Sequence, residues 1–183
     1  MNNPKPCEWK SNELSRGYIA DYKAFNFVDG EGVRCSLYVS GCPFHCEGCY
    51  NKAAQSFKYG KPYTKELEDD ILKDIGHESV QGLTLLGGEP FLNTATCLSV
   101  VKRIRATYGE TKDIWSWTGY TWDEMMQETA DKLELLSLID VLVDGRFEQK
   151  LFDPNLAFRG SSNQRIIDVQ KSFATGEVVL YEL

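Results

Sequence analysis

The chain has 183 residues, 42% of them hydrophobic and 12% aromatic, and its 27 Asp and Glu outnumber its 20 Lys and Arg, which gives a formal net charge of −7. This length fits one domain with a substantial core, and the apolar content excludes a disordered chain. No run approaches the ~18 consecutive apolar residues of a membrane span, and no dense block of Lys or Arg offers contacts to phosphate. We therefore expect neither a membrane nor a nucleic acid as partner.

The N-terminal part is predicted to be a flexible arm followed by two strands. Residues 1–16 are polar, contain two Pro, and lack the apolar stretch of a secretory signal, so we expect a cytoplasmic protein whose six Cys stay reduced. One domain then covers residues 17–183. Within it, residues 18–28 have a strand-like pattern that ends at a turn over 29–32, and residues 35–40 form a short β-rich run.

Downstream, helices and strands are predicted to alternate. Thr64 can cap a first helix, Gly109 can stop a second, and Thr121 with Glu124 forms a capping box for a third. The predicted elements in chain order are a helix over 64–75, a strand over 82–86, a helix over 94–108, a strand over 114–117, a helical region over 121–136 and a strand over 139–143. Alternating apolar and polar residues near the end predict a hairpin over 165–183.

This order of elements predicts an α/β fold. Strands that alternate with helices favour a parallel sheet, and a complete eight-unit barrel takes roughly 250 residues. The chain is shorter, so we expect an incomplete, open parallel β/α barrel. The carboxyl ends of the strands form the active-site rim in such folds, so the loops after residues 40, 86, 117 and 143 should face one another.

Three thiols stand together in the loop after residue 40. Cys42, Cys46 and Cys49 have the spacing C-x₃-C-x₂-C, and no fourth Cys follows at a matching distance. A zinc site completed by His45 is one alternative, but His45 lies between two thiols, where a short loop can hardly direct it to the same metal. A disulfide framework is another, and the expected cytosolic setting argues against it. Three thiolates on a [4Fe–4S] cluster would leave one iron open to a substrate.

The sequence Gly87-Gly88-Glu89-Pro90 follows a predicted buried strand. The two glycines have no Cβ and so allow backbone to approach a ligand closely, and the Glu89 carboxylate can accept hydrogen bonds from an ammonium group. The same residues can also form an ordinary turn between a strand and a helix. Their place in the chain predicts that they face the three thiols.

The triple-Cys loop followed by the Gly-Gly-Glu turn resembles the radical S-adenosylmethionine (SAM) enzymes. Residues 29–34 look like the Gly-Pro-Gly-x-Arg run of the activases of glycyl radical enzymes, with Glu31 in place of Pro. Four further runs are similar to the activating proteins of anaerobic (class III) ribonucleoside-triphosphate reductase, namely 49–52, 115–120, 142–146 and 159–164. The resemblance covers residues 18–164 and implies a barrel of the radical SAM type.

The resemblance also implies a reaction. A reduced [4Fe–4S] cluster on Cys42, Cys46 and Cys49 would cleave bound SAM to methionine and a 5′-deoxyadenosyl radical. That radical would take the Cα hydrogen of a glycine in the large subunit of the reductase and leave a glycyl radical there. A low-potential electron donor such as flavodoxin would reduce the cluster. The residues implied to contact SAM are Gly48, Cys49, Tyr50, Gly87, Gly88 and Glu89.

Other residues have less defined roles. Cys35 and Cys97 lie on predicted apolar faces and are expected in the core, whereas Cys7 lies in the arm. Asp144 ends a strand at the predicted rim, where related activases place carboxylates near SAM, sometimes with a cation, so it is a candidate for that position. Residues 159–164 either hold the partner, hold SAM or close the barrel.

Two other functions compete with this hypothesis. A radical SAM enzyme that acts on a small metabolite, such as a carboxy-deazaguanine synthase, shares the short open barrel but is not expected to carry the runs at 115–120 and 159–164. A non-catalytic iron–sulfur module for electron transfer predicts a fourth ligand and no SAM site. The Gly-Gly-Glu turn argues for a SAM site.

Overall fold

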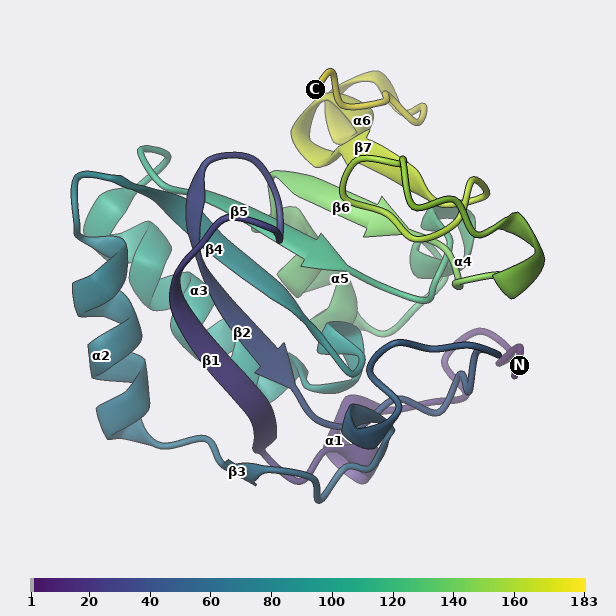
Figure 1. Ribbon diagram of the computed structural model, residues 1–183, viewed down its shortest axis with the longest axis horizontal. Helices are drawn as coiled ribbons and strands as arrows, with labels where there is room; N and C mark the ends of the chain where they lie inside the picture. Colours follow the sequence, from purple (N-terminus) through teal and green to yellow (C-terminus); the bar gives the residue numbers. More distant parts are fainter. Residues whose placement is uncertain (1) are drawn as a thin grey trace.

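A seven-stranded sheet with helices against one face forms the body of the protein (Figure 1), as described for residues 2–183 by a computed structural model. The strands are β1 (Tyr18–Asn26), β2 (Val33–Val39), β3 (Lys61–Pro62), β4 (Val80–Gly87), β5 (Asp113–Trp117), β6 (Val141–Asp144) and β7 (Arg165–Asp168). The α-helices are α1 (Ser11–Leu14), α2 (Lys65–Ile75), α3 (Thr94–Tyr108), α4 (Trp122–Met125), α5 (Ala130–Ser137) and α6 (Val169–Thr175). Short 3-10 turns cover Ala53–Gln55, Pro90–Leu92 and Gln149–Leu151.

The strand order is β3-β1-β2-β4-β5-β6-β7. The four central strands, β2, β4, β5 and β6, are parallel, as the alternation of strands and helices predicts. The edges differ from that prediction, because β1 pairs antiparallel with β2 and β3, and β7 pairs antiparallel with β6. The connection between β1 and β2 is too short for the crossover of a dozen or more residues that a parallel pair needs. The edge strands β3 and β7 do not pair with each other, so the sheet is open.

The two faces of the sheet have different compositions because side chains alternate along each strand. On β2, Cys35, Leu37 and Val39 point into the main hydrophobic core beneath the helices, which confirms the expected position of Cys35. Cys97 on α3 joins the same core, also as expected. A second, smaller core on the opposite face contains Trp115. The helix-covered face is therefore filled with apolar side chains, and the other face is partly open.

The helices begin and end near the predicted positions. Thr64 caps α2 by accepting a hydrogen bond from the Leu67 N–H, and α3 ends before Gly109. Thr121 and Glu124 form the predicted capping box, and the helical region that follows is broken into α4 and α5. Within residues 2–183, no helix has both the length and the apolar character needed to cross a membrane.

Both ends of the described chain are hydrogen-bonded to other parts of the fold. Near the start, the Asn2 N–H donates to the Phe44 carbonyl (2.8 Å), and Lys132 donates to the Trp9 carbonyl (2.6 Å). Near the end, residues 177–181 return antiparallel to β7, but the helix α6 connects the two where the pattern predicts a turn. Asp168 caps α6, which explains why a helix begins there.

Candidate functional site

A cavity of about 450 Å³ lies at the edge of the sheet where β2, β4, β5 and β6 end. Because these strands are parallel, the loops that follow them meet at one edge. The predicted site residues that line the cavity are Cys42, Cys46, Cys49, Tyr50, Gly87, Gly88 and Glu89. Segments that are far apart in the sequence therefore form one site, as the order of elements predicts.

The loop that carries the thiols, residues 40–49, is held by the segment that follows it. The Gly41 N–H donates to the Ala54 carbonyl (2.7 Å), and the Cys42 N–H donates to the Gln55 carbonyl (3.0 Å). Gly41 has a φ of +106°, in the left-handed region that favours glycine. Backbone contacts alone therefore give this thiol loop a defined path.

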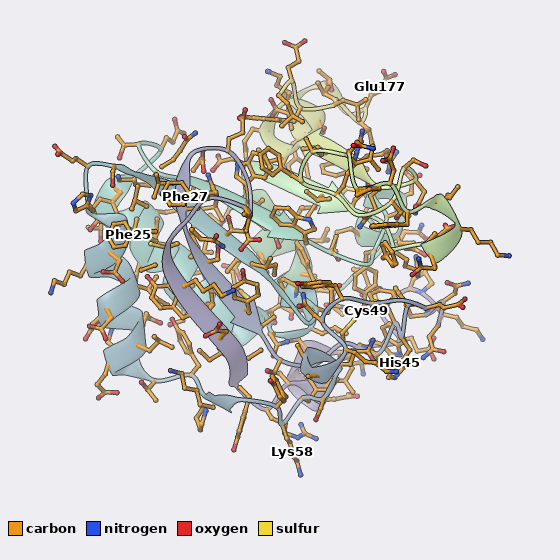
Figure 2. The ribbon with its side chains drawn as sticks, in the orientation of Figure 1. Phe25, Phe27, His45, Cys49, Lys58 and Glu177 are labelled. Carbon is orange, nitrogen blue, oxygen red and sulfur yellow. The ribbon has the colours of Figure 1, made fainter. Side chains whose placement is uncertain are left out.

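Three thiols line the cavity, and among residues 2–183 no fourth thiol and no His joins them there. Burial raises the pKa of Cys42 and Cys46, and backbone N–H groups beside the two sulfurs partly oppose that rise. The alternative zinc ligand His45 is exposed, as Figure 2 shows, and its Nδ1 lies 3.1 Å from Oε1 of Gln55.

The donor set fits the implied cluster. In the part of the chain that the structure describes, no three His, Cys, Asp or Glu side chains are close enough to hold a single metal ion. Thiolates that bind different irons of one cluster do not need to converge on one point. Three thiols around one open cavity thus fit a [4Fe–4S] cluster with one iron left free, and they do not form the zinc alternative.

The Gly-Gly-Glu turn packs directly against the thiol loop. The Gly88 N–H donates to the Val39 carbonyl (2.7 Å), and the Glu89 N–H donates to the Gly41 carbonyl (2.8 Å). A Cβ on Gly88 would lie 2.6 Å from the Gly41 oxygen. The expectation that both glycines make room for a ligand is thus revised, because the room that Gly88 leaves is taken by the backbone of the thiol loop.

The Glu89 side chain is completely buried and links this turn to the one after β5. Its oxygens accept hydrogen bonds from the Thr118 hydroxyl (2.9 Å) and from the N–H groups of Gly119 (2.8 Å) and Phe91 (3.1 Å). Burial nevertheless raises the pKa of this carboxyl to about 7. A carboxylate has about four acceptor positions, so one position remains for a donor from the cavity.

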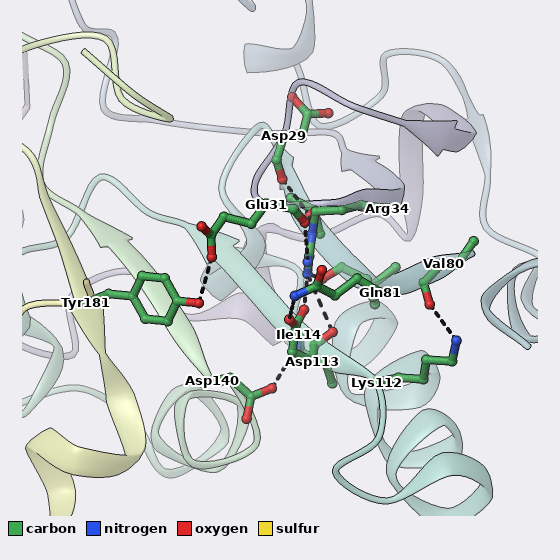
Figure 3. Close-up of polar contacts among 12 residues, drawn as sticks. Asp29, Glu31, Arg34, Val80, Gln81, Lys112, Asp113, Ile114, Asp140 and Tyr181 are labelled. Atoms are coloured by element: carbon green, nitrogen blue, oxygen red, sulfur yellow. Dashed lines mark hydrogen bonds and ion pairs between the residues drawn. The ribbon is translucent and has the colours of Figure 1, made fainter. Parts of the chain in front are cut away.

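Residues 29–34 fold over the open face of the sheet (Figure 3). The buried Arg34 guanidinium pairs with the Asp113 carboxylate (2.5 Å), and the Glu31 carboxylate accepts a hydrogen bond from the Tyr181 hydroxyl (2.8 Å). Pro would fix φ at the position of Glu31. Here the contact with the C-terminal segment restrains that turn instead.

Gly48 and Tyr50 belong to a neighbouring cavity of about 500 Å³ that is mainly apolar. Gly48 has a φ of +73° and lies against Gln149, so a Cβ there would collide with that side chain. The Tyr50 ring is 99% exposed and stands at the edge of both cavities. Of the residues implied to contact SAM, Gly48 is the one that the structure separates from the main cavity.

Asp144 does not line either cavity. Its buried carboxylate accepts hydrogen bonds from the Trp122 N–H (2.8 Å) and from the Arg165 guanidinium (2.5 and 3.1 Å). The next residues, Gly145 and Arg146, do line the main cavity. The strand end is therefore at the rim as predicted, but its carboxylate is directed into a structural ion pair.

The cavity lining also includes Asp29, Arg146 and Gln164, which the sequence analysis did not assign to the site. Asp29 begins the run over 29–34, which resembles the Gly-Pro-Gly-x-Arg run of the activases, and its carboxylate accepts a hydrogen bond from the Tyr38 hydroxyl. Arg146 forms a two-pronged ion pair with Glu124 (2.9 and 3.0 Å). Gln164, the third, ends the run over 159–164 and donates to the Gly145 carbonyl (3.0 Å). The run was visible in the sequence, but its contact with the cavity wall depends on tertiary structure.

The chain is similar to a known iron–sulfur family and to known activating proteins. Residues 28–167 match the family described as "4Fe-4S single cluster domain". The chain is 46% identical to the anaerobic ribonucleoside-triphosphate reductase-activating protein of Pasteurella multocida over 149 residues, which cover 79% of this chain and 93% of that protein. It is similar to the proteins of the same name from Escherichia coli K12 (46% identity, 78% of this chain and 93% of that one) and from Enterobacteria phage T4 (38% identity, 77% and 87%).

Proposed function

The chain belongs to the family of anaerobic ribonucleoside-triphosphate reductase-activating proteins, and from this membership we propose that it activates such a reductase as a radical SAM enzyme. One observation supports the mechanism most directly: three thiols and the Gly-Gly-Glu turn line the same cavity. When bound, the [4Fe–4S] cluster and SAM supply an electron transfer into the sulfonium that breaks the S–C5′ bond and leaves a radical able to take the Cα hydrogen of a glycine.

Each part of the site has a task in this proposal. Cys42, Cys46 and Cys49 hold the cluster, and their loop is fixed by backbone bonds to residues 54–55. The Glu89 carboxylate, which has an unused acceptor position, receives the ammonium group of SAM. The backbone around Gly87 and Gly88 holds the SAM methionine beside the thiols, and residues 48–50 face the adenosyl group.

The open sheet is, in this proposal, the incomplete barrel of a radical SAM domain that covers residues 17–183. Its open face admits a protein substrate, the large subunit of the reductase, and a low-potential donor such as flavodoxin supplies the electron. Apolar side chains at the two cavities are unusually exposed, namely Val28 (71%), Tyr50 (99%) and Phe152 (52%). Exposed aromatic and aliphatic side chains around a polar cavity favour a protein partner over a small metabolite.

The experiment is anaerobic. We expect the protein with a reconstituted cluster, a reductant and SAM to produce 5′-deoxyadenosine, and addition of the reductase to produce a glycyl radical in electron paramagnetic resonance. Deoxyadenosine without a glycyl radical would instead favour a metabolite substrate. If the protein has full cluster absorbance but forms no deoxyadenosine, the result would favour the alternative of a non-catalytic module for electron transfer.

A further inference from the structure

A lysine-rich segment follows the thiol loop in the chain and is hydrogen-bonded to it. Residues 50–65, called here the lysine segment, contain four of the 20 Lys and Arg of the chain and none of its 27 Asp and Glu. The rest of the chain is strongly acidic, so this segment is a positively charged region in a negatively charged protein. Such a region is a basis for recognising an acidic partner.

Three of these lysines are free to meet a partner. Lys52, Lys58 and Lys61 are exposed, and within residues 2–183 no salt bridge involves them. Lys65 differs, because it pairs with Glu68 and with another carboxylate of α2. In Figure 2 the Lys58 side chain extends away from the body at the lower edge of the view.

The lysine segment is also very close to the thiols. Its residues 54 and 55 accept the hydrogen bonds from the N–H groups of Gly41 and Cys42, and its Tyr59 carbonyl accepts one from the Ser40 hydroxyl (2.7 Å). The segment that carries the three exposed lysines is therefore hydrogen-bonded directly to the start of the loop that holds Cys42. Tyr50, Asn51 and Gln55 of the segment line the main cavity, but none of the three exposed lysines lines either cavity.

This geometry answers a requirement of the proposed function, on which the inference rests. The main cavity has to admit SAM and the protein substrate, so an electron donor needs another approach to the cluster. We propose that Lys52, Lys58 and Lys61 form the docking surface for an acidic one-electron donor protein. One electron leaves the reduced donor, which is oxidised by one step, and ends in the S–C5′ bond of SAM, which breaks to give methionine and the deoxyadenosyl radical.

The test reverses the charge of this surface in the full, cluster-loaded protein. The variant Lys52→Glu/Lys58→Glu/Lys61→Glu is compared with Lys73→Glu/Lys102→Glu/Lys171→Glu, which changes the net charge by the same amount on α2, α3 and α6. Deoxyadenosine formation is driven either by reduced flavodoxin, an acidic donor, or by photoreduced 5-deazariboflavin, an uncharged small molecule.

We expect the first variant to lose about tenfold in the flavodoxin-driven rate at low salt and to keep the deazariboflavin-driven rate within about twofold. Titration calorimetry should show weaker flavodoxin binding, both with and without the cluster, and a smaller dependence on salt. The control variant should behave like the wild-type protein in every assay.

Two results would overturn the inference while leaving the proposed function intact. One is an unchanged flavodoxin affinity and rate in the first variant. The other is a raised KM for the reductase with deazariboflavin as reductant, which would assign the surface to the reductase. A wild-type protein that makes no deoxyadenosine even with deazariboflavin would refute the proposed function itself.

Discussion

Glu68 in the helix layer and Glu89 at the strand ends are both almost completely buried, yet their surroundings differ. Burial alone would raise the pKa of Glu68, but hydrogen bonds from Ser99, Arg103 and Tyr63 lower it overall. The Arg103 guanidinium, only 2.6 Å away, supplies a positive charge. Glu68 is therefore satisfied within the fold, which is the usual state of a buried carboxylate.

Glu89 has neutral donors and, among residues 2–183, no ion pair. Its pKa is raised to about 7 because burial outweighs the bonds from Gly119, Phe91 and Thr118. A buried carboxylate that forms no ion pair, at the wall of a cavity, is suited to a cationic ligand. The difference between the two glutamates thus separates a region built for stability from one built to bind.

The largest expected effect contrasts cysteines of the same two regions. Replacing Cys42, Cys46 or Cys49 singly by Ala should abolish both the cluster absorbance and SAM cleavage, because the proposed function makes each thiolate a ligand of the cluster. Cys97 lies in the main hydrophobic core, so Cys97→Ala should keep the cluster absorbance and SAM cleavage and lower the free energy of unfolding by about 1 kcal/mol. Anaerobic absorbance spectra, deoxyadenosine assays and denaturant titrations check the two outcomes. Retained cleavage in any one of the three thiol variants would remove that residue from the ligand set.

The next effect concerns the glutamates themselves. Glu89→Gln keeps the shape but removes the charge, so we expect a 10- to 100-fold loss of SAM affinity, which corresponds to roughly 1.5–3 kcal/mol for a charged hydrogen bond. Glu68→Gln should leave SAM affinity unchanged and destabilise the fold by about 2 kcal/mol, because Arg103 loses its buried partner. Equilibrium SAM binding and chemical unfolding measure the pair. If both variants bind SAM alike, the contrast between the two regions is wrong.

The pH dependence of stability should differ in the same way. Glu89 titrates at about 7 in the folded protein and near 4.5 when unfolded, so its contribution is complete below pH 4.5 and is lost as the pH rises to 7. Glu68 has a lowered pKa, so its contribution is present above pH 4.5 and is lost as the pH falls below it.

Unfolding of the cluster-free protein between pH 4.5 and 7 checks these signs. The free energy of unfolding of the Glu89→Gln variant, relative to that of the wild type, should increase by up to about 3 kcal/mol as the pH rises across this range. The difference between Glu68→Gln and wild type should stay constant there. SAM affinity should increase as the pH rises through 7, because in the proposed site the ammonium group of SAM binds the ionised form of Glu89. A flat affinity profile would argue against that contact.

Much of this arrangement could be predicted from local sequence. The helix over 65–75 follows from the Thr64 cap and its apolar spacing, and the thiol spacing indicated the cluster directly. The parallel centre of the sheet followed from the alternation of elements, which also brought the Cys and Gly-Gly-Glu loops to one edge. The cap and the thiol spacing are local patterns, and the sheet follows from the order of elements along the chain.

The parts that could not be predicted depend on contacts between distant segments. A glycine is needed at position 88 because the carbonyl of Gly41, on another loop, lies too close for a Cβ. Two of the hydrogen-bond donors to Glu89 come from the turn after β5. The charge of Arg34 on β2 is compensated by Asp113 on β5, two strands away in the sheet. The two members of each pair are far apart in the sequence, so no local sequence pattern predicts their contact. The C-terminal helix α6 was missed for a different reason, because its short apolar pattern also fits a strand.

The smallest expected functional effect is at Asp144, where the sequence and the structure suggest different roles. Asp144→Asn should lower stability by roughly 2 kcal/mol, because the buried carboxylate pairs with Arg165 and accepts the N–H of Trp122. SAM affinity should change less than twofold, since Asp144 lines neither cavity. Denaturant titration and SAM binding are measured on the same preparation, with Arg165→Met as the matched control. A loss of SAM affinity in Asp144→Asn that Arg165→Met does not share would return Asp144 to the binding site. Equal destabilisation with unchanged affinity in both would place it with Glu68, among the buried carboxylates that the fold satisfies by itself.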